Sequence, residues 1–551
     1  MIRATILSAA LIGLAVAAPT DPDFSAERFK AHVAFLSDDL LEGREAGTRG
    51  HEIAAKYVAT QLSLLGVKPG GDQGTYFKQV DLLESRLAGL PSVVVTTPAG
   101  AKTFKQGVTA MIRGPLGGGT VHVRAPLVFV GYGMTDKTMG YDDYAGLDVR
   151  GKIVVVLQGS PKDMDSEIGA HLQSEQARFA ADHGAAAALF VQNRAFASAF
   201  PWERIVEFLG EPKTAWARKD GTPEDSSHGL KASVLVEPKA AASLFDGAAK
   251  TLAAILDESD KPGGRPKGME LKSSAEISVA TRVRRYSSPD VIGVIEGSDP
   301  KLKEQYVALM GHVDHIGINK TGTGDRINNG ALDNAAGTAT LLEVARALTT
   351  SARPRRSILI VANTAEEKGL LGADYFAHNP TVPIDRITAA IDLDMPLLLY
   401  DFTDVIAFGA GHSTLERALR KAGAEMGVKL SPDPMPEQAV FVRSDHYAMV
   451  QRGVPAVMLA TGMANGGETA WPKFLSTHYH HPSDDMSQPI VWTAGAKFAE
   501  LNYRVVRMLA DDDEPPRWYA NDYFGDLFAP KAPKTPKTPN AAGPSSRVPQ
   551  P

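Results

Sequence analysis

The chain has 551 residues, of which 44% are hydrophobic and 22% charged, with a formal net charge of −6 at pH 7. The length predicts more than one domain, since single hydrophobic cores stop growing at roughly 250–300 residues. The negative charge gives no reason to expect a nucleic acid or an anionic membrane as partner. The chain has no cysteine, which excludes disulfides and thiolate ligands, so any metal must be held by His, Asp and Glu.

The first residues are typical of an export signal. Arg3 precedes an apolar stretch at residues 4–16, and small residues follow at Ala15 and Ala17. A membrane span needs about 20 apolar residues, and this stretch is shorter. We therefore expect residues 1–18 to be a cleaved signal peptide, no membrane span, and a mature protein that is periplasmic or secreted.

The next part of the chain predicts helices and then a small module. An apolar periodicity over residues 24–66 indicates helices. A glycine-rich turn or linker at 114–120 and a second linker at 261–268 enclose alternating patterns. These patterns predict strands at 125–133, 153–157 and 185–193 and a helix at 169–184. Strand, helix and strand at this spacing predict a small α/β or β-rich module.

Beyond residue 268 strands and helices alternate again, which indicates a parallel sheet covered by helices. The expected strands are 290–297, 306–315, 357–363 and 387–395, with a helix at 334–350. The fold class we expect is α/β, with a mixed, mostly parallel sheet flanked by helices. Residues 529–551 are rich in proline and poor in core-forming residues, so we expect a disordered or polyproline-like tail.

Possible metal ligands lie at or next to the ends of several of these strands, where ligand sites of open α/β sheets are found. Each has a simpler interpretation: Asp333 is a good helix N-cap, and adjacent glutamates favour a helix N-terminus. Carboxylates with imidazoles suit catalytic zinc, cobalt or manganese. The presence of several such side chains at strand ends of one sheet favours a metal site over these simpler interpretations. The segments concerned are His312-Val313-Asp314-His315, Asp333, Glu366-Glu367, Asp394 and the histidine-rich loop at 478–481.

Five segments in order resemble the zinc exopeptidase family that includes leucyl aminopeptidase, aminopeptidases S and Y, and glutamate carboxypeptidase II. They are GHVDHIG (311–317), NGALDNAAG (329–337), NTAEEKGLLGA (363–373), IDLDM (391–395) and YHHPSD (479–484). Residues 35–69 resemble the start of the family's catalytic domain, and residues 128–157 resemble its inserted protease-associated domain. The resemblance implies a catalytic domain in two parts, 24–112 and 271–525, around a smaller β-rich insert at 113–270.

The resemblance also implies two zinc ions, with cobalt or manganese as possible substitutes. Asp333 would bridge the two ions, with His312 and Asp394 on one and Glu367 and His480 on the other. His478 and His481 flank His480 and are competing candidates, although the tyrosine-histidine-x-proline-x-aspartate match favours His480.

Three further residues receive catalytic roles from the resemblance. Glu366 would be the general base that activates a metal-bound water, Asp314 would hold His312, and Tyr479 would help to stabilise the oxyanion. Segment 441–462 resembles the substrate side of the family's cleft. Its pocket candidates are Arg443, Ser444, Asp445 and His446.

The expected function is that of an exported dizinc aminopeptidase acting on peptides with a free N-terminus. Acidic neighbours of the ligands, Asp392 and Asp445 among them, favour an ammonium group, whereas a carboxypeptidase needs a cationic clamp such as Arg443. The alternatives are a carboxypeptidase of the same family, a glutaminyl cyclase-like acyltransferase with one zinc, and a non-catalytic receptor-type binding ectodomain. The complete set of five ligands argues against the last two.

Overall fold

A computed structural model describes residues 22–537 of the chain, apart from residues 226, 228 and 321–322. The expected signal peptide, residues 1–18, and the last part of the proline-rich tail, from residue 538, lie outside the described residues. Within the described ranges, no helix is both long and apolar enough to cross a membrane.

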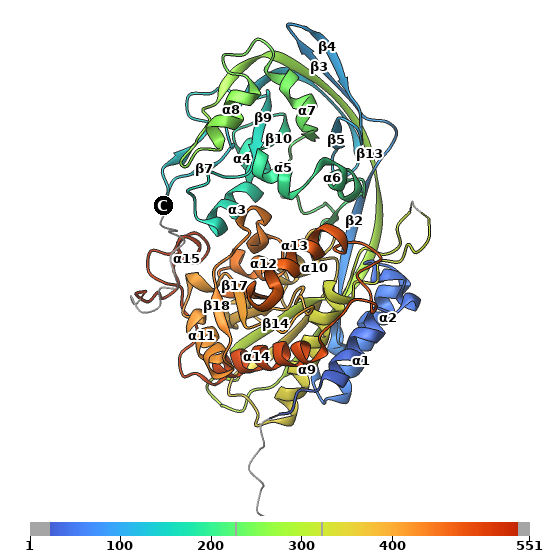
Figure 1. Cartoon of the computed structure of the whole chain (residues 1–551), viewed down its shortest axis with the longest axis vertical. Coiled ribbons are helices and arrows are strands. Elements are labelled where there is room, and N and C mark those ends of the chain that lie inside the picture. The colour runs from blue at the N-terminus through green and yellow to red at the C-terminus, as the bar shows by residue number, and fades with distance from the viewer. Residues whose placement is uncertain (1–21, 226, 228, 321–322, 538–551) are drawn as a thin grey trace, which may run out of the picture.

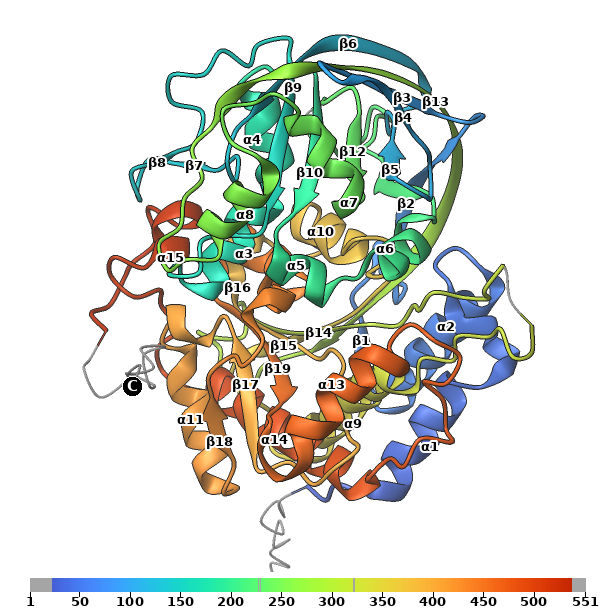
Figure 2. The same ribbon diagram turned by 45° about the horizontal axis from the view of Figure 1, so that its top comes forward.

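The chain folds around two hydrophobic cores, which form the lower and upper parts of Figure 1. The larger core runs from Phe29 to Phe524, and the second runs from Val93 to Val279. Two long strands, β2 (Phe77–Leu87) and β13 (Met269–Ile295), connect the two parts and pair with each other. Figure 2 shows β13 curving along the side of the molecule from one part to the other.

The boundaries of the insert differ from those we expected. Strands β3 (Ser92–Thr97), β4 (Gly100–Phe104) and β5 (Ala110–Arg113) pack in the second core rather than in the catalytic domain. The glycine-rich segment 114–120 is a turn that leads from β5 into β6 (Gly119–Phe129) within the insert. At the other boundary, β13 passes through residue 270 without interruption, because its first half pairs with β3 and β6.

The catalytic domain contains the mixed, mostly parallel sheet that the sequence predicts. Its strand order is β13, β15, β14, β16, β19, β17 and β18, and the four strands from β15 to β19 are parallel. All residues of β15 are buried, as expected of a strand covered on both faces. The bounds are β14 (Tyr306–His312), β15 (Ser357–Asn363), β16 (Ile387–Asp392), β17 (Asp404–Phe408), β18 (Lys429–Ser431) and β19 (Ala456–Thr461).

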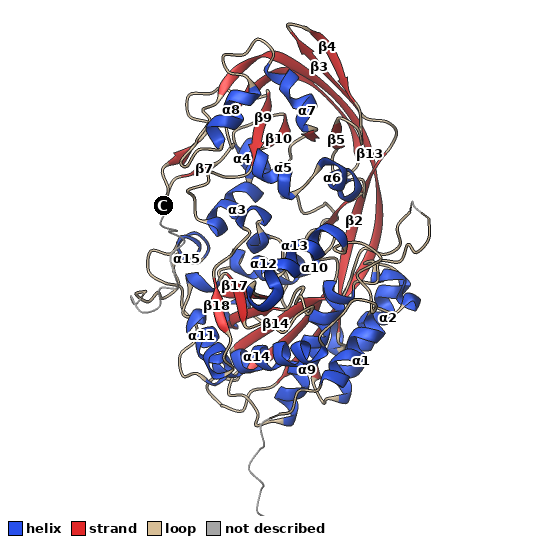
Figure 3. Cartoon of the chain, viewed as in Figure 1, coloured by secondary structure: helices blue, strands red, loops and turns tan. Residues whose placement is uncertain are grey.

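Helices cover both faces of this sheet (Figure 3). The lower layer is formed by α1 (Ala26–Leu36), α9 (Ala336–Thr350), α14 (Trp492–Asp511), α2 (Arg49–Leu64) and α11 (Leu415–Glu425). In α1, Ser25 caps the N-terminus, and Phe29, Val33 and Leu36 form the buried stripe. Between the sheet and the insert lie α10 (Leu371–His378), α12 (His446–Gln451) and α13 (Gly467–Thr477).

The insert has its own sheet, in which β6, β9, β10 and β12 are parallel. Strand β5 pairs with β12 in the antiparallel direction. The single helix expected at 169–184 is divided at Glu175 into two helices, α3 and α4. The bounds are β9 (Ile153–Gln158), β10 (Ala187–Gln192), β11 (Lys213–Trp216), β12 (Ser233–Val236), α3 (Ser166–Ser174), α4 (Gln176–Asp182), α5 (Arg194–Ala199), α6 (Trp202–Leu209), α7 (Pro238–Ala241) and α8 (Leu252–Ser259).

The first residues of the proline-rich tail are ordered, so the expectation of disorder from residue 529 onwards is wrong for 529–537. The Thr535 amide donates to the Trp518 carbonyl at 3.1 Å, and the Ala520 amide donates to the Thr535 carbonyl at 2.8 Å. Lys537 Nζ donates to the Gly411 carbonyl at 2.8 Å. Backbone pairing with the segment that precedes α15 (Tyr523–Phe528) thus holds this part of the tail, although few apolar side chains are present.

Candidate metal centre

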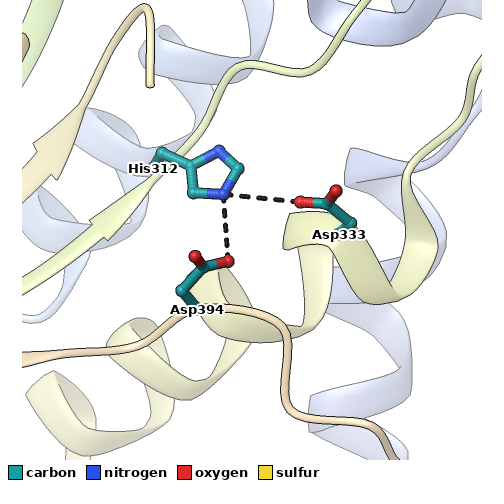
Figure 4. Close-up of side chains that lie close together, drawn as sticks. All are labelled: His312, Asp333 and Asp394. Carbon is teal, nitrogen blue, oxygen red and sulfur yellow. Dashed lines mark hydrogen bonds and ion pairs between the residues drawn. The ribbon is translucent and has the colours of Figure 1, made fainter. Parts of the chain in front are cut away.

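Side chains from the carboxyl ends of two parallel strands and from the turn before α9 meet at one point. His312 ends β14, Asp394 follows β16, and Asp333 lies in the turn before α9. Figure 4 shows the His312 imidazole facing both carboxylates. His312 Nε2 is 3.5 Å from Asp333 Oδ1 and 3.2 Å from Asp394 Oδ1. The convergence that the sequence predicts is therefore present in the fold.

A second group lies on the other side of Asp333. His480 Nε2 is 3.3 Å from Asp333 Oδ2 and 3.1 Å from Glu367 Oε2. Asp333 thus directs one carboxylate oxygen towards His312 and Asp394 and the other towards His480 and Glu367. This is the arrangement of a bridging carboxylate between two groups of ligands.

The spacing of these atoms fits zinc. Two ligands of a tetrahedral zinc, each about 2.0–2.2 Å from the ion, are roughly 3.3–3.6 Å apart. The four distances across the two groups, 3.1 to 3.5 Å, are close to that value. Imidazole nitrogens and carboxylate oxygens also match the donor preference of a catalytic zinc site.

His315 belongs to this site, although the sequence did not lead us to assign it. Its Nδ1 donates to Glu367 Oε1 at 2.6 Å and is 3.9 Å from Asp333 Oδ2. A separation of 2.6 Å is that of a direct hydrogen bond and is shorter than the spacing of two ligands on one ion. His315 therefore orients Glu367, whose other oxygen faces His480. The sequence feature that could have indicated this role is the second histidine of the segment His312-Val313-Asp314-His315.

Glu366 and Glu367 experience opposite electrostatic environments. Burial, followed by the neighbouring carboxylates Glu367, Asp394 and Asp445, raises the pKa of Glu366 well above its usual value, against the opposing charge of His312. Burial also raises the pKa of Glu367, but the charges and hydrogen bonds of His480 and His315 outweigh it and hold this pKa well below its usual value. One glutamate is thus held ionised, whereas its neighbour can accept a proton.

Asp314 supports the site differently from what we expected. His312 Nδ1 lies 3.1 Å from the main-chain oxygen of Asp314 and 3.9 Å from its carboxylate. The carboxylate instead accepts the amides of Glu366 at 3.1 Å and Glu367 at 3.4 Å. Asp314 therefore holds the imidazole through its carbonyl and the two glutamates through its side chain. Burial raises the pKa of this carboxyl to about 7.

The turn that carries Asp333 is held by residues to which the sequence gave no role. The Asp484 carboxylate accepts the amides of Leu332 and Asp333, both at 3.0 Å. Fully buried Arg44 donates to the carbonyls of Val313 at 2.9 Å and Gly330 at 3.1 Å. These contacts fix both the strand end after His312 and the start of the Asp333 turn.

The loop at 478–484 directs one of its three histidines into the site. His480 faces Asp333 and Glu367, whereas His478 Nδ1 pairs with the Ser483 hydroxyl at 2.9 Å. His481 contacts Arg204 of the insert. The geometry therefore favours His480 among the three candidates.

Tyr479 lies at the edge of the site, and its ring stacks on that of His480 with centroids 3.8 Å apart. Arg443 Nη2 donates to the Tyr479 hydroxyl at 3.3 Å, and this arginine is the exposed member of the four pocket candidates. Ser444, Asp445 and His446 are buried. Ser444 and the His446 amide donate to Asp392, so these residues hold a buried carboxylate rather than line an open pocket.

Comparison with known proteins identifies both parts of the chain. Residues 290–506 match peptidase family M28, and residues 123–225 match the PA domain. Aminopeptidase NAALADL1 of Mus musculus is 33% identical over 142 residues, which are 24% of this chain and 17% of that protein. Aminopeptidase Y of Saccharomyces cerevisiae is 27% identical over 250 residues, 45% of this chain and 43% of that protein. The chain thus spans less than half the length of these relatives.

A solved structure extends the likeness in fold to most of the chain. The aminopeptidase from Aneurinibacillus sp. strain AM-1 superposes with a TM-score of 0.51 at 21% sequence identity, covering 90% of this chain and 96% of that chain. The structure at 21% identity shows a shared fold, and the two domain matches agree with the catalytic domain and the insert that the sequence motifs predict. Residues 290–506 are thus assigned to peptidase family M28 and residues 123–225 to the PA domain.

Proposed function

We propose that this peptidase is a dizinc aminopeptidase that removes residues from the free N-terminus of peptides. The observation that carries the proposal is the position of Asp333, whose two oxygens face His312 and Asp394 on one side and His480 and Glu367 on the other. Its relatives include aminopeptidases of mouse and yeast, which supports this activity.

The chemistry assigned to the residues is hydrolysis of one peptide bond. Zinc supplies Lewis acidity, which lowers the pKa of water and polarises a carbonyl. Glu366 accepts a proton from the attacking water and delivers it to the leaving amine nitrogen as the carbon–nitrogen bond breaks. The products are a free amino acid and a peptide shortened by one residue, so one water is consumed in each turnover.

Two other residues have roles in this scheme. Glu367 stays ionised because His480 and His315 stabilise its charge, so it suits a ligand rather than a base. The Tyr479 hydroxyl, which accepts a hydrogen bond from Arg443, is assigned the role of donor to an oxygen that gains charge. Its buried position raises its pKa well above the usual value, so the hydroxyl keeps its proton.

Charge near the site supports the N-terminal direction of cleavage. Asp392 is fully buried beside Asp394; burial raises its pKa, but the hydrogen bonds and charge of His446 and the hydrogen bond of Ser444 outweigh it and hold this pKa below its usual value. An ammonium group is attracted by this negative charge and a carboxylate is repelled. Arg443, the candidate clamp of a carboxypeptidase, is already engaged by the Tyr479 hydroxyl and the Gln438 carbonyl.

The experiment compares four forms of one peptide, with the N-terminus free or acetylated and the C-terminus free or amidated. We expect hydrolysis to require the free N-terminus and to be insensitive to amidation. Cleavage of the acetylated peptide from its C-terminal end would show a carboxypeptidase and contradict the proposed direction.

We also propose that the mature chain is exported to the periplasm or secreted, on the basis of the signal-like residues 1–18. Mass spectrometry of protein recovered from the producing cells checks this. A mature protein that begins near residue 18 supports export, whereas an intact Met1 contradicts cleavage.

A further inference from the structure

The insert reaches the loop that carries Tyr479 and His480. Helices α5 and α6 lie on the side of the insert that faces the catalytic domain (Figure 1). Two of its residues, Phe200 between these helices and Arg204 in α6, contact residues of the catalytic site. The family assignment gives neither residue a role.

Arg204 holds the main chain of the loop. Its Nη2 donates to the Tyr479 carbonyl at 3.0 Å, and its Nη1 contacts His481 Nε2. The arginine is only partly exposed, and both nitrogens engage residues on either side of His480. A planar guanidinium that bonds two consecutive parts of a loop restricts its position more than a single contact would.

Phe200 supports the hydroxyl end of the same tyrosine. The Arg443 guanidinium lies over the Phe200 ring, 5.3 Å from its centroid, which is a cation–π arrangement. Arg443 Nη2 in turn donates to the Tyr479 hydroxyl at 3.3 Å. The insert thus contacts Tyr479 directly at its carbonyl and, through Arg443, at its hydroxyl.

We propose that the PA insert is part of the catalytic machinery, because Arg204 and Phe200 are positioning residues for Tyr479. This inference rests on the proposed function, in which the Tyr479 hydroxyl donates to the oxygen that gains charge. A displacement of about 1 Å from the productive geometry can cost on the order of a hundredfold in rate. The contacts described above join Arg204 to Tyr479 and His481, and Phe200 to Arg443, so the effect of removing either residue should appear in kcat and not in zinc content.

The test uses Arg204→Gln in the full chain, with Arg194→Gln as the matched control. Arg194 lies in the neighbouring helix α5, but it pairs with Asp257 at 2.7 Å and with Asp260, both within the insert. We expect R204Q to lower kcat at least tenfold, with KM within twofold and zinc content unchanged, whereas R194Q behaves as the parent. Phe200→Leu should lower kcat in the same way by a smaller factor.

A second set of variants, made in the Tyr479→Phe protein, distinguishes the loss of Tyr479 positioning from general damage to the fold. In Tyr479→Phe, which lacks the hydroxyl to be positioned, R204Q should lower kcat by less than threefold further. Amide hydrogen exchange in peptides spanning 477–485 should be at least fivefold faster in R204Q than in R194Q, a readout that needs no turnover.

Several results would overturn the inference: a kcat for R204Q within twofold of the parent, an equal loss in the Tyr479→Phe background, loss of zinc in parallel with kcat, or unchanged exchange at 477–485. A parent enzyme that hydrolyses no N-terminal residue would contradict the proposed function instead. Hydrogen exchange would then still decide whether the insert holds this loop.

Discussion

Glu366 and Glu367 are adjacent in the chain, yet the protein moves their pKa values in opposite directions. His315 and His480 lower the pKa of Glu367, while burial and neighbouring carboxylates raise that of Glu366. The difference arises because successive side chains after β15 point to different parts of the site. Glu367 lies 2.6 Å from His315 and 3.1 Å from His480, whereas His312 is 3.9 Å from Glu366. A pair of this kind can provide one anionic ligand and one proton acceptor.

The opposite pKa shifts of the two glutamates predict different effects of substituting each one. Glu366→Gln should lower kcat by about two to four orders of magnitude, as is typical for loss of a general base, and leave the zinc content at the parental value. Glu367→Gln removes an anionic ligand, so it should lower zinc content after dialysis. Elemental analysis and steady-state kinetics of both proteins check the pair, and loss of zinc from Glu366→Gln would show that the roles are exchanged.

His315 should be required for full activity through its hydrogen bond to Glu367. Replacement of residues that orient metal ligands costs roughly 10–100-fold in metal affinity or activity, and we expect this loss for His315→Ala. His478→Ala is the matched control, because His478 pairs with Ser483 and does not face the carboxylates. A zinc titration followed by activity measures the difference, and equal behaviour of the two variants would exclude this role.

The same residues show how far the sequence could predict the site. Strand β15 could be predicted because residues 358–362 are a continuous apolar run, and parallel strands bring their carboxyl ends together. His315 was missed because nothing local distinguishes a histidine that binds a metal from one that orients a ligand. The roles of Arg44 and Arg204 at the site could not be predicted, since Val313 and Tyr479, which they contact there, lie more than 260 residues away in the chain.

The insert boundaries were misplaced for a related reason. Clusters of glycine in a sequence mark turns, and the segment 114–120 is such a turn. It does not show on which core the flanking strands pack. Strand β13 serves both cores, pairing with β6 in the insert and with β15 in the catalytic sheet, so no change in composition marks the passage between them.

A mostly buried ion triad predicts how stability depends on pH. His412 Nε2 is 2.6 Å from Glu167 Oε2 of the insert, and its Nδ1 is 2.6 Å from Asp522 Oδ2. Burial lowers the pKa of His412, but the Glu167 charge and the hydrogen bonds to both carboxylates outweigh it and raise the pKa to about 10. Since the folded pKa lies above the unfolded value of about 6.5, the stabilisation is complete below pH 6.5 and is lost as pH rises through 10.

His412→Gln should therefore be less stable than the parent by about 3–5 kcal/mol at pH 6, the usual cost of breaking a buried pair. The difference should shrink as pH rises towards 10, where the parental imidazole loses its proton. Urea unfolding at pH 6, 8 and 10 measures it. A difference that is constant across this range would mean that His412 is neutral in the folded protein.

The ordered start of the tail predicts a difference between two truncations. Removal of residues 529–551 breaks the backbone pairing of Thr535 with Trp518 and Ala520, and each lost hydrogen bond costs about 0.5–1.5 kcal/mol. Removal of residues 538–551 leaves these contacts in place. Thermal unfolding should show a Tm lowered by a few degrees, about 2–4 °C per kcal/mol for a domain of some 150–250 residues, for the longer deletion only. Equal Tm values for both would show that 529–537 adds nothing to stability.

The number of zinc ions bound to the purified, active protein tests the central claim most directly. With Asp333 placed between two groups of ligands, we predict about two zinc ions per chain by elemental analysis. Activity should be lost on chelation and restored as the second equivalent is added back. One ion per chain at full activity would contradict the two-metal account and support a single-zinc enzyme, and an active protein with no bound metal would contradict the metal centre altogether.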